Sequence, residues 1–339
     1  MSASSNNGSK NPAPRPKRVS APAIAARKIG AGNPPETARL VMVTAYDAPS
    51  AKISHRAGVD MILVGDSLAM VVLGHDDTLS VTVEEMAHHT RAVARGLVSS
   101  ETAGCPEARP LVVGDMPWMS YHVSVDDTVR NAAALMRAGA GCVKLEGGSK
   151  RVPMIKAILD AEIPVMGHIG LTPQSVNTFG GFKVQGKTIE AVDSLIADAK
   201  SLEAAGCFAI VLEAVPDSVA RLVTDAVSIP TIGIGAGPHC DGQVLVWHDL
   251  LGIEDRIVPK FVRKYDDQSE DSIEAIRTYA SDVRSGAFPG PGESYSASVE
   301  LTAALLGRAD ETNDEAMADA AMADHLVDLD DETLIALYS

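Results

Sequence analysis

The sequence has few of the features that mark zinc-binding, disulfide-rich or membrane proteins. Its 339 residues include four cysteines, none with CxxC spacing, so there is neither a zinc motif nor a disulfide framework. No apolar run approaches the length of a membrane-spanning helix. Aromatic residues make up 4% of the chain, which predicts an aliphatic core. From these absences we expect a reduced, cytoplasmic protein.

The chain also lacks concentrated positive charge. Its formal net charge is −16, but residues 296–339 alone contain eleven acidic residues and one arginine. The rest of the chain is therefore only mildly acidic. Because there is no basic stripe and no basic amphipathic helix, we expect the protein to bind neither nucleic acid nor a membrane.

The two ends of the chain differ from its middle. Residues 1–35 contain no acidic residue and are rich in Ser, Asn, Pro and Ala, a composition that predicts a disordered basic tail. Similar compositions occur in transit peptides, but the proline-rich start disfavours the amphipathic helix of such peptides. Residues 296–339 form an acidic extension, for which a docking helix and a solvated tail both remain open. The catalytic domain is then expected to span residues 36–295.

Between these ends, eight short apolar runs alternate with amphipathic stretches. The runs occupy residues 39–47, 60–67, 110–117, 141–148, 163–170, 208–215, 229–237 and 256–261. Helical patterns recur between them, at residues 82–97, 125–140, 192–206 and 216–227. Eight such units predict a (β/α)8 TIM barrel. No GxGxxG sequence follows the first run, which disfavours a doubly wound dinucleotide-binding sheet.

Polar side chains stand at the ends of these predicted strands. They are Asp66, Ser67, Asp115, Lys144, Glu146, His168 and Glu213. In a (β/α)8 barrel the carboxyl ends of all strands meet at one mouth, where active sites lie. Several buried carboxylates share such a mouth only if a cation compensates their charge. The pattern therefore predicts a bound divalent metal.

The types of ligand indicate which metal this is. Carboxylates without paired cysteines or clustered histidines favour a hard ion such as Mg2+ over Zn2+. Asp66 and Asp115, which follow neighbouring strands, form the best direct pair of ligands. Glu146 is then suited to an outer position that reaches the metal through water.

Taken singly, each of these residues also has a purely structural interpretation. A lone aspartate caps a helix or ends a strand in an ion pair, and Ser67 is equally suited to capping a turn. For Lys144 the alternative is a side chain that faces solvent. For His168 it is a histidine satisfied within the core, and for Glu213 an ion pair with a structural arginine.

A long glycine-rich connection follows the fifth predicted strand. Residues 168–187 read HIGLTPQSVNTFGGFKVQGK and show no helical period before Thr188. Loops of this length on the upper face of a barrel commonly serve as lids or binding loops. An irregular surface loop is the alternative.

An ordered set of short segments runs from TAYD to SGAFPGPGESYS. The segments between these two are VGDS, VTVEEMAHHTRAVARG, GDMPWMSY, RAGAGCVKLEGG, GHIGLTPQSVNTFGGFKVQG, LEAVP, IGIGAG and DGQVLVWHD. Together they closely resemble the 3-methyl-2-oxobutanoate (ketopantoate) hydroxymethyltransferase family. The resemblance implies a Mg2+-dependent (β/α)8 barrel that forms a homo-oligomer, a decamer in many bacterial members. It also implies synthesis of ketopantoate for pantothenate and coenzyme A.

The same resemblance assigns a role to each residue at the strand ends. Asp66 and Asp115 correspond to the metal ligands and Glu146 to the outer carboxylate. Ser67, Lys144 and His168 would contact the keto acid, whose carboxylate and keto oxygen bind the metal beside the two aspartates. Glu213 would be the catalytic acid or base. The enolate of 3-methyl-2-oxobutanoate, stabilised by Mg2+, would attack the one-carbon unit of 5,10-methylenetetrahydrofolate.

Two other interpretations remain. The first is a Mg2+-dependent barrel of the phosphoenolpyruvate mutase and isocitrate lyase type, many of which carry a reactive cysteine on a mobile loop. The loop of residues 168–187 contains no cysteine, which disfavours this alternative. The second is a catalytically silent scaffold, which the presence of Asp66, Asp115 and Glu213 disfavours. Ala69, where many relatives have glycine, is a mild departure from the family pattern.

Overall fold

The computed structural model describes residues 17–30, 32, 34, 39–99, 108–254, 259–306 and 308. The chain divides into two compact units, Met1–Glu270 and Asp271–Ser339. The predicted catalytic domain, residues 36–295, spans this division. Within the described ranges, no helix combines the length and the apolar character that a bilayer crossing requires.

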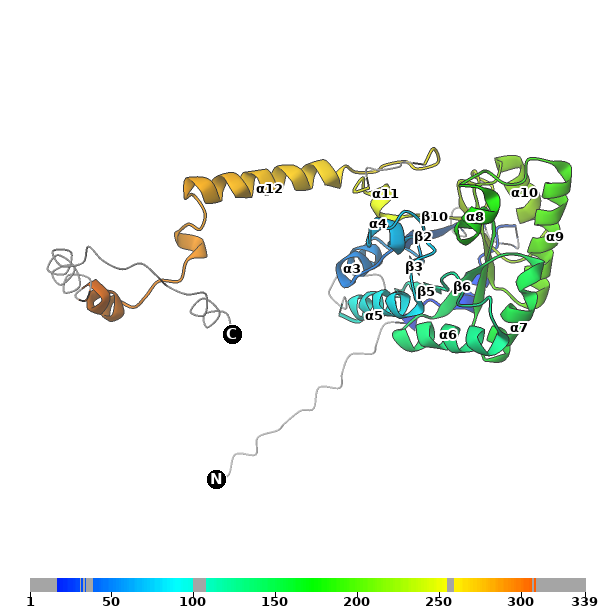
Figure 1. Ribbon diagram of the computed structural model, residues 1–339, viewed down its shortest axis with the longest axis horizontal. Coiled ribbons are helices and arrows are strands. Elements are labelled where there is room, and N and C mark those ends of the chain that lie inside the picture. Colours follow the sequence, from blue (N-terminus) through cyan, green and yellow to red (C-terminus); the bar gives the residue numbers. More distant parts are fainter. Residues whose placement is uncertain are drawn as a thin grey trace, which may run out of the picture. The chain divides into compact units, whose positions relative to one another are not determined.

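The first unit contains a closed barrel of eight parallel strands, which confirms the predicted (β/α)8 fold (Figure 1). In spatial order the strands are β10 (Gly242–Leu245), β2 (Leu40–Thr44), β3 (Met61–Val64), β5 (Leu111–Asp115), β6 (Cys142–Glu146), β7 (Val165–Gly170), β8 (Ala209–Glu213) and β9 (Thr231–Ile234). Because every strand is parallel to its neighbours, all carboxyl ends open at one mouth.

Helices lie around the barrel (Figure 1). The longer ones are α3 (Ala48–Arg56), α5 (Val83–Ser99), α6 (Val125–Ala138), α7 (Val152–Asp160), α9 (Ile189–Ala205) and α10 (Asp217–Asp225). Helix α6 begins at Ser124, whose side chain accepts a hydrogen bond from the N–H of Asp127, and ends at Gly139 in the left-handed conformation. The four helical patterns of the sequence thus correspond to α5, α6, α9 and α10.

The eighth strand is not where the sequence analysis placed it. The barrel closes through β10, whereas the prediction was residues 256–261. Residues 256–258 lie outside the described residues, and Pro259–Phe261 are not a strand. The strand β10 has only four residues and begins with glycine and glutamine, so its apolar run was too short to stand out. Gly242 lies close to the backbone of Leu40, where an added Cβ would meet the Leu40 carbonyl oxygen at 2.6 Å.

Two apolar cores hold the unit together. One fills the space between the strands and the surrounding helices and includes Val64 and Leu135. The other fills the barrel interior and includes Leu40, Met61 and Leu111. Both cores are aliphatic in the main, as the low aromatic content predicted.

The segment predicted to be a disordered tail is folded over residues 17–30. Strand β1 (Lys17–Arg18) pairs with β4 (Ala108–Arg109), and helix α1 (Ala21–Ala25) follows, capped by Ser20. Ile24 is fully buried and belongs to the core inside the barrel. Disorder is therefore wrong for this stretch, because composition averaged over 35 residues concealed one apolar helical turn. Residues 1–16 lie outside the described residues.

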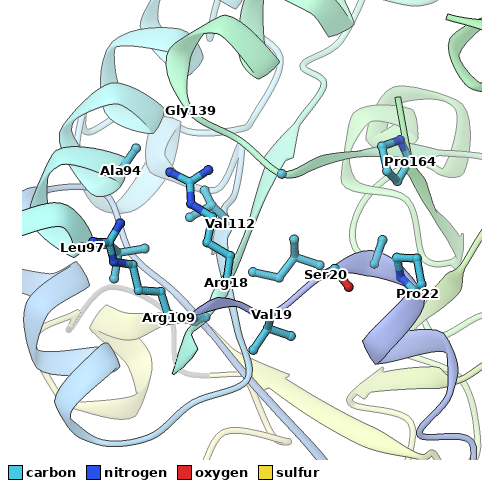
Figure 2. Close-up of a pocket in the computed structure, with 14 residues that line it drawn as sticks. Arg18, Val19, Ser20, Pro22, Ala94, Leu97, Arg109, Val112, Gly139 and Pro164 are labelled. Atoms are coloured by element: carbon cyan, nitrogen blue, oxygen red, sulfur yellow. The ribbon is translucent and has the colours of Figure 1, made fainter. Parts of the chain in front are cut away.

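This N-terminal segment borders a cavity of about 240 Å³ (Figure 2). The side chains of Arg18 and Arg109 line it together with apolar residues of α5 such as Ala94 and Leu97. Leu111, the first residue of β5, also lines it. The cavity therefore lies at the end of the barrel where strands begin, opposite the mouth, and is not the candidate site.

The second unit contains most of the helix α12 (Gln268–Ser285) and the short turn η3 (Pro291–Glu293). No residue of α12 is buried. Of the predicted acidic extension, residue 307 and residues 309–339 lie outside the described residues.

Candidate active site

The strand register brings the predicted site residues together at the mouth. Asp115 pairs with Lys144 between β5 and β6, and Glu146 pairs with His168 between β6 and β7. All four are nearly inaccessible to solvent. The mouth is therefore lined by buried ionic groups on consecutive strands.

Asp66 and Asp115 are direct neighbours. The backbone N–H of Asp66, two residues beyond β3, donates to Asp115 Oδ2 at 3.1 Å. Both carboxylates are buried, at 5% and 1% exposure. Burial, followed by the negative charges of Asp115 and Glu146, raises the pKa of Asp66 well above its usual value. Two acids held this close in a dry site repel each other, and a divalent cation would relieve that repulsion.

The donor set fits a hard cation. Asp66 and Asp115 offer carboxylate oxygens, and Glu146 Oε1 is buried with no hydrogen bond from any described residue. No group of three or more His, Cys, Asp or Glu side chains is arranged to hold a metal ion within the described part of the chain. Mg2+ commonly takes one or two carboxylates and completes its shell with water and substrate. Two direct aspartates and one outer glutamate suit that ion better than zinc.

Lys144 faces the acids and not solvent, so the alternative interpretation of this residue is wrong. It is 3% exposed, and its Nζ lies 2.9 Å from Asp115 Oδ1. Although burial opposes the charge, the nearby carboxylates of Asp115, Asp66 and Glu146 raise the pKa of Lys144 above its usual value. Lys144 is therefore a fixed positive charge beside the two aspartates.

His168 links two glutamates. Its Nε2 lies 3.2 Å from Glu213 Oε2, and its Nδ1 lies 3.5 Å from Glu146 Oε1. Burial and the charge of Lys144 oppose protonation. The neighbouring carboxylates of Glu146 and Glu213 outweigh them and raise the pKa of His168 to about 9. Glu213 is thus held by a histidine, and not by an arginine as the structural alternative supposed.

Ser67 does not cap the helix that follows it. Helix α4 (Leu68–Val71) begins at Ser67, but the serine side chain makes no capping hydrogen bond. Instead its Oγ lies 2.9 Å from the hydroxyl of Tyr46. Tyr46 lies at the end of the first barrel segment and was not singled out from the sequence, although it belongs to the TAYD motif.

Gln174 and Tyr121 also belong to the site, although no pattern in the sequence pointed to them. Gln174 lies in η2 (Pro173–Ser175) after β7, and its side-chain amide donates to Asp66 Oδ2 at 2.8 Å. The hydroxyl of Tyr121 donates to Gln174 Oε1 at 2.5 Å. Both residues lie within the motifs GDMPWMSY and GLTPQSV. A neutral polar side chain in a loop has no strand-end position that would have distinguished it.

The connection after β7 has a buried base and an exposed outer part. Gln174 is 6% exposed, whereas Phe182 and Val184 are 52% and 45% exposed. The single-turn helix α8 (Val176–Phe179) lies between them. Helix α9 then begins after Thr188, where the sequence analysis placed the start of helical periodicity.

Known structures share this fold at low sequence identity. Oxaloacetate acetylhydrolase in complex with the product oxalate aligns with a TM-score of 0.51 and 13% identity, over 89% of this chain and 99% of that chain. Phosphonopyruvate hydrolase in complex with oxalate and Mg++ aligns with a TM-score of 0.50 and 13% identity, over 85% and 97%. Likeness at this identity shows the barrel fold alone.

Sequence relatives are much closer. The family described as ketopantoate hydroxymethyltransferase matches residues 31–291. The 3-methyl-2-oxobutanoate hydroxymethyltransferase of Syntrophobacter fumaroxidans is 56% identical over 76% of this chain and 88% of its own. The protein of the same name from Clostridium acetobutylicum is 54% identical over 76% and 90%. The chain is therefore an enzyme that belongs to the ketopantoate hydroxymethyltransferase family.

Proposed function

We propose that this enzyme transfers a hydroxymethyl group from 5,10-methylenetetrahydrofolate to 3-methyl-2-oxobutanoate and so forms 2-dehydropantoate, or ketopantoate. Such a reaction supplies pantothenate and coenzyme A synthesis. The observation that carries the proposal is the row of buried ionic groups at the mouth, where Asp66 and Asp115 lie beside Lys144. The names of relatives that are more than 50% identical support the same reaction.

Asp66 and Asp115 would hold Mg2+ or another divalent cation, with Glu146 in the outer position. When bound, such a cation polarises the keto carbonyl and stabilises the negative charge that develops on its oxygen. The buried, mutually repelling carboxylates are suited to this role. Lys144 and Ser67 would bind and orient the keto acid, because Lys144 contacts Asp115 and Ser67 follows Asp66 directly in the chain.

Glu213 is the residue best placed to move a proton. Its Oε2 lies 3.2 Å from His168 Nε2. A carboxylate accepts the C3 proton of the keto acid, and the electron pair of that C–H bond forms the new C–C bond to the methylene carbon of the folate. Water supplies the hydroxyl group as the bonds between that carbon and the two folate nitrogens break. The C3 proton and the remaining proton of the water end on those nitrogens, and tetrahydrofolate leaves. His168 keeps Glu213 in position for this step.

The described cysteines do not favour the mutase and lyase alternative. Cys142, Cys207 and Cys240 are all buried and unbonded to other cysteines. Burial raises the pKa of Cys207 to about 12 and also raises the pKa of Cys142. Neither thiol is in its reactive thiolate form near neutral pH.

We also propose that the enzyme is a cytoplasmic homo-oligomer, in the form of a decamer. The resemblance to the family supports this assembly. Analytical ultracentrifugation of the full chain would give its mass directly, and a monomer at micromolar concentration would contradict the proposal.

The experiment that tests the function is exchange of the C3 proton of 3-methyl-2-oxobutanoate in deuterated water, followed by NMR with and without Mg2+. We expect Mg2+-dependent exchange that is lost in Asp66→Ala and kept in Asp126→Ala, whose side chain is 81% exposed on α6. Addition of 5,10-methylenetetrahydrofolate should then yield ketopantoate. A folded, Mg2+-saturated protein that forms no ketopantoate would overturn the proposed function.

A further inference from the structure

Gln174, in the chain segment after β7, is hydrogen-bonded to two of the proposed metal-binding acids. Its side-chain Nε2 donates to Asp66 Oδ2 at 2.8 Å, and its backbone N–H donates to Glu146 Oε2 at 3.0 Å. One residue thus contacts a proposed direct ligand and the proposed outer ligand. All three residues are at least nine-tenths buried.

The amide of Gln174 has one favourable orientation. Nε2 carries two N–H donors, and both are used, toward Asp66 and toward the backbone carbonyl of Met116 at 2.9 Å. Oε1 accepts the hydroxyl of Tyr121 at 2.5 Å. Rotation of the amide by half a turn would place its oxygen against a carboxylate and a carbonyl. The Asp66 carboxylate is therefore held in one rotamer by a donor that itself has no freedom to turn.

Tyr121 links Gln174 to strand β6. Its hydroxyl donates to Gln174 and accepts a hydrogen bond from the backbone N–H of Glu146 at 3.2 Å. Tyr121 is 1% exposed, so bulk solvent does not compete with either partner of this hydroxyl. The loop residue, the tyrosine and β6 form one hydrogen-bonded network.

We propose that Gln174 is a positioning residue that couples the conformation of residues 171–187 to divalent-cation binding at the mouth. This inference rests on the proposed function, since it takes Asp66 and Glu146 as metal-site residues. If the loop moves outward, Asp66 loses its side-chain donor and Glu146 loses its backbone donor. Cation binding needs those carboxylates fixed, so the bound cation favours the closed loop, and the closed loop favours the cation to the same extent.

The loop offers a matched pair of glutamines for the test. Gln185 lies in the same connection, and among the described residues its side chain donates to the backbone carbonyl of Lys183 at 2.8 Å. Replacement of Gln174 or Gln185 by methionine removes each amide at nearly constant volume. Only the first change breaks the contact with Asp66. Tyr121→Phe provides a second probe, because it removes the hydroxyl that orients Gln174 and keeps the ring.

Two readouts are needed, and neither is turnover. The first is the dissociation constant for Mn2+, measured by electron paramagnetic resonance without substrate. The second is the rate at which trypsin cleaves after Lys183 and Lys187, two exposed residues of the loop, with and without Mn2+. We expect Gln174→Met to weaken Mn2+ binding about tenfold and to abolish the slowing of cleavage by Mn2+. Tyr121→Phe should show a smaller loss of both, and Gln185→Met should match the wild type.

The outcomes separate this inference from the proposed function. If the wild type binds Mn2+ and Gln174→Met, folded by circular dichroism, binds it equally and keeps the same protection, the coupling is overturned and the metal site stands. Equal losses in Gln174→Met and Gln185→Met would also overturn it, because they would assign the effect to the loop in general. If the wild type binds no divalent cation at all, the metal site of the proposed function fails together with the coupling.

Discussion

The two ends of the barrel both bury charged side chains, but they do so in opposite ways. Where the strands begin, Asp241 accepts hydrogen bonds from the ammonium group of Lys28 at 2.9 Å and from the backbone N–H groups of Ile29 and Thr231. Lys28 donates in addition to the carbonyl of Thr224 at 2.8 Å. In this pair one buried acid meets one buried base, and each of these contacts is made within the chain.

At the mouth the acids outnumber the bases. Two basic side chains, Lys144 and His168, face four acids: Asp66, Asp115, Glu146 and Glu213. A buried charge that is fully paired stabilises the fold only while its partner is present. A buried surplus of one sign is unfavourable until a ligand of opposite charge binds. Buried acids are therefore informative about function where they outnumber the basic groups that face them.

The largest effect is expected where the charges are balanced. Asp241→Asn leaves the ammonium group of Lys28 buried beside a neutral partner, so we expect the free energy of unfolding to fall by about 3–5 kcal/mol. Chemical denaturation would measure it. The control is Asp225→Asn, which removes an exposed partner of Arg221 at 3.8 Å and should cost less than about 1 kcal/mol. Equal effects of the two changes would mean that burial does not distinguish these pairs.

The next effect is expected on catalysis and not on folding. Asp115→Asn keeps the shape of the side chain and removes a charge that the proposed metal needs. We expect kcat to fall by at least roughly 100- to 1,000-fold, with the fold intact because the charges of Asp66 and Glu146 still face Lys144. Formation of ketopantoate at saturating Mg2+ is the measurement. Full activity in this variant, with the metal concentration buffered by a chelator, would contradict the assignment of Asp115.

A third change is expected to raise stability, whereas Asp241→Asn is expected to lower it. In EDTA, the wild-type protein holds Asp66 against Asp115 and Glu146, and burial, followed by the charges of these two acids, raises the pKa of Asp66. Asp66→Asn removes that repulsion and still offers Gln174 an oxygen acceptor, so we expect stability to rise by about 0.5–2 kcal/mol. Saturating Mg2+ should stabilise the wild type and not the variant. Loss of stability in EDTA would show that the mouth is as well compensated as the opposite end.

The barrel and the strand-end residues could be predicted because they follow a period. Buried parallel strands are short apolar runs, and the residue after each run lies at the mouth wherever the strand is in the sheet. This rule predicts that Asp66 and Asp115 lie together at the mouth. It failed for β10, whose four residues carry too few apolar side chains to form such a run.

The contacts that complete each end could not be predicted in this way. Gln174 is 108 residues from Asp66, and Lys28 is 213 residues from Asp241. Each is a polar residue in a segment without periodicity, so only the folded chain shows which backbone groups and carboxylates it reaches. The average composition of residues 1–35 likewise hid the buried turn around Ile24. The local pattern of apolar residues predicts where strands end. Which buried charges lack a partner depends on long-range hydrogen bonds that only the folded chain shows.

The smallest effect is expected at an acid that is only partly buried. Asp249, in α11 (Trp247–Leu250), is partly buried, and burial, followed by the charge of Glu254, raises the pKa of Asp249 to about 6. An unfolded aspartate has a pKa of about 4, so the folded protein binds the extra proton between these values. Stability therefore falls as the pH rises from about 4 to about 6 and then stays level. Asp249→Asn should remove that fall and stabilise the protein near pH 7 by about 1 kcal/mol, a figure reduced for solvent screening. Denaturation curves of both proteins across this pH window would show it, and parallel curves would mean that Asp249 is as well solvated when folded as when unfolded.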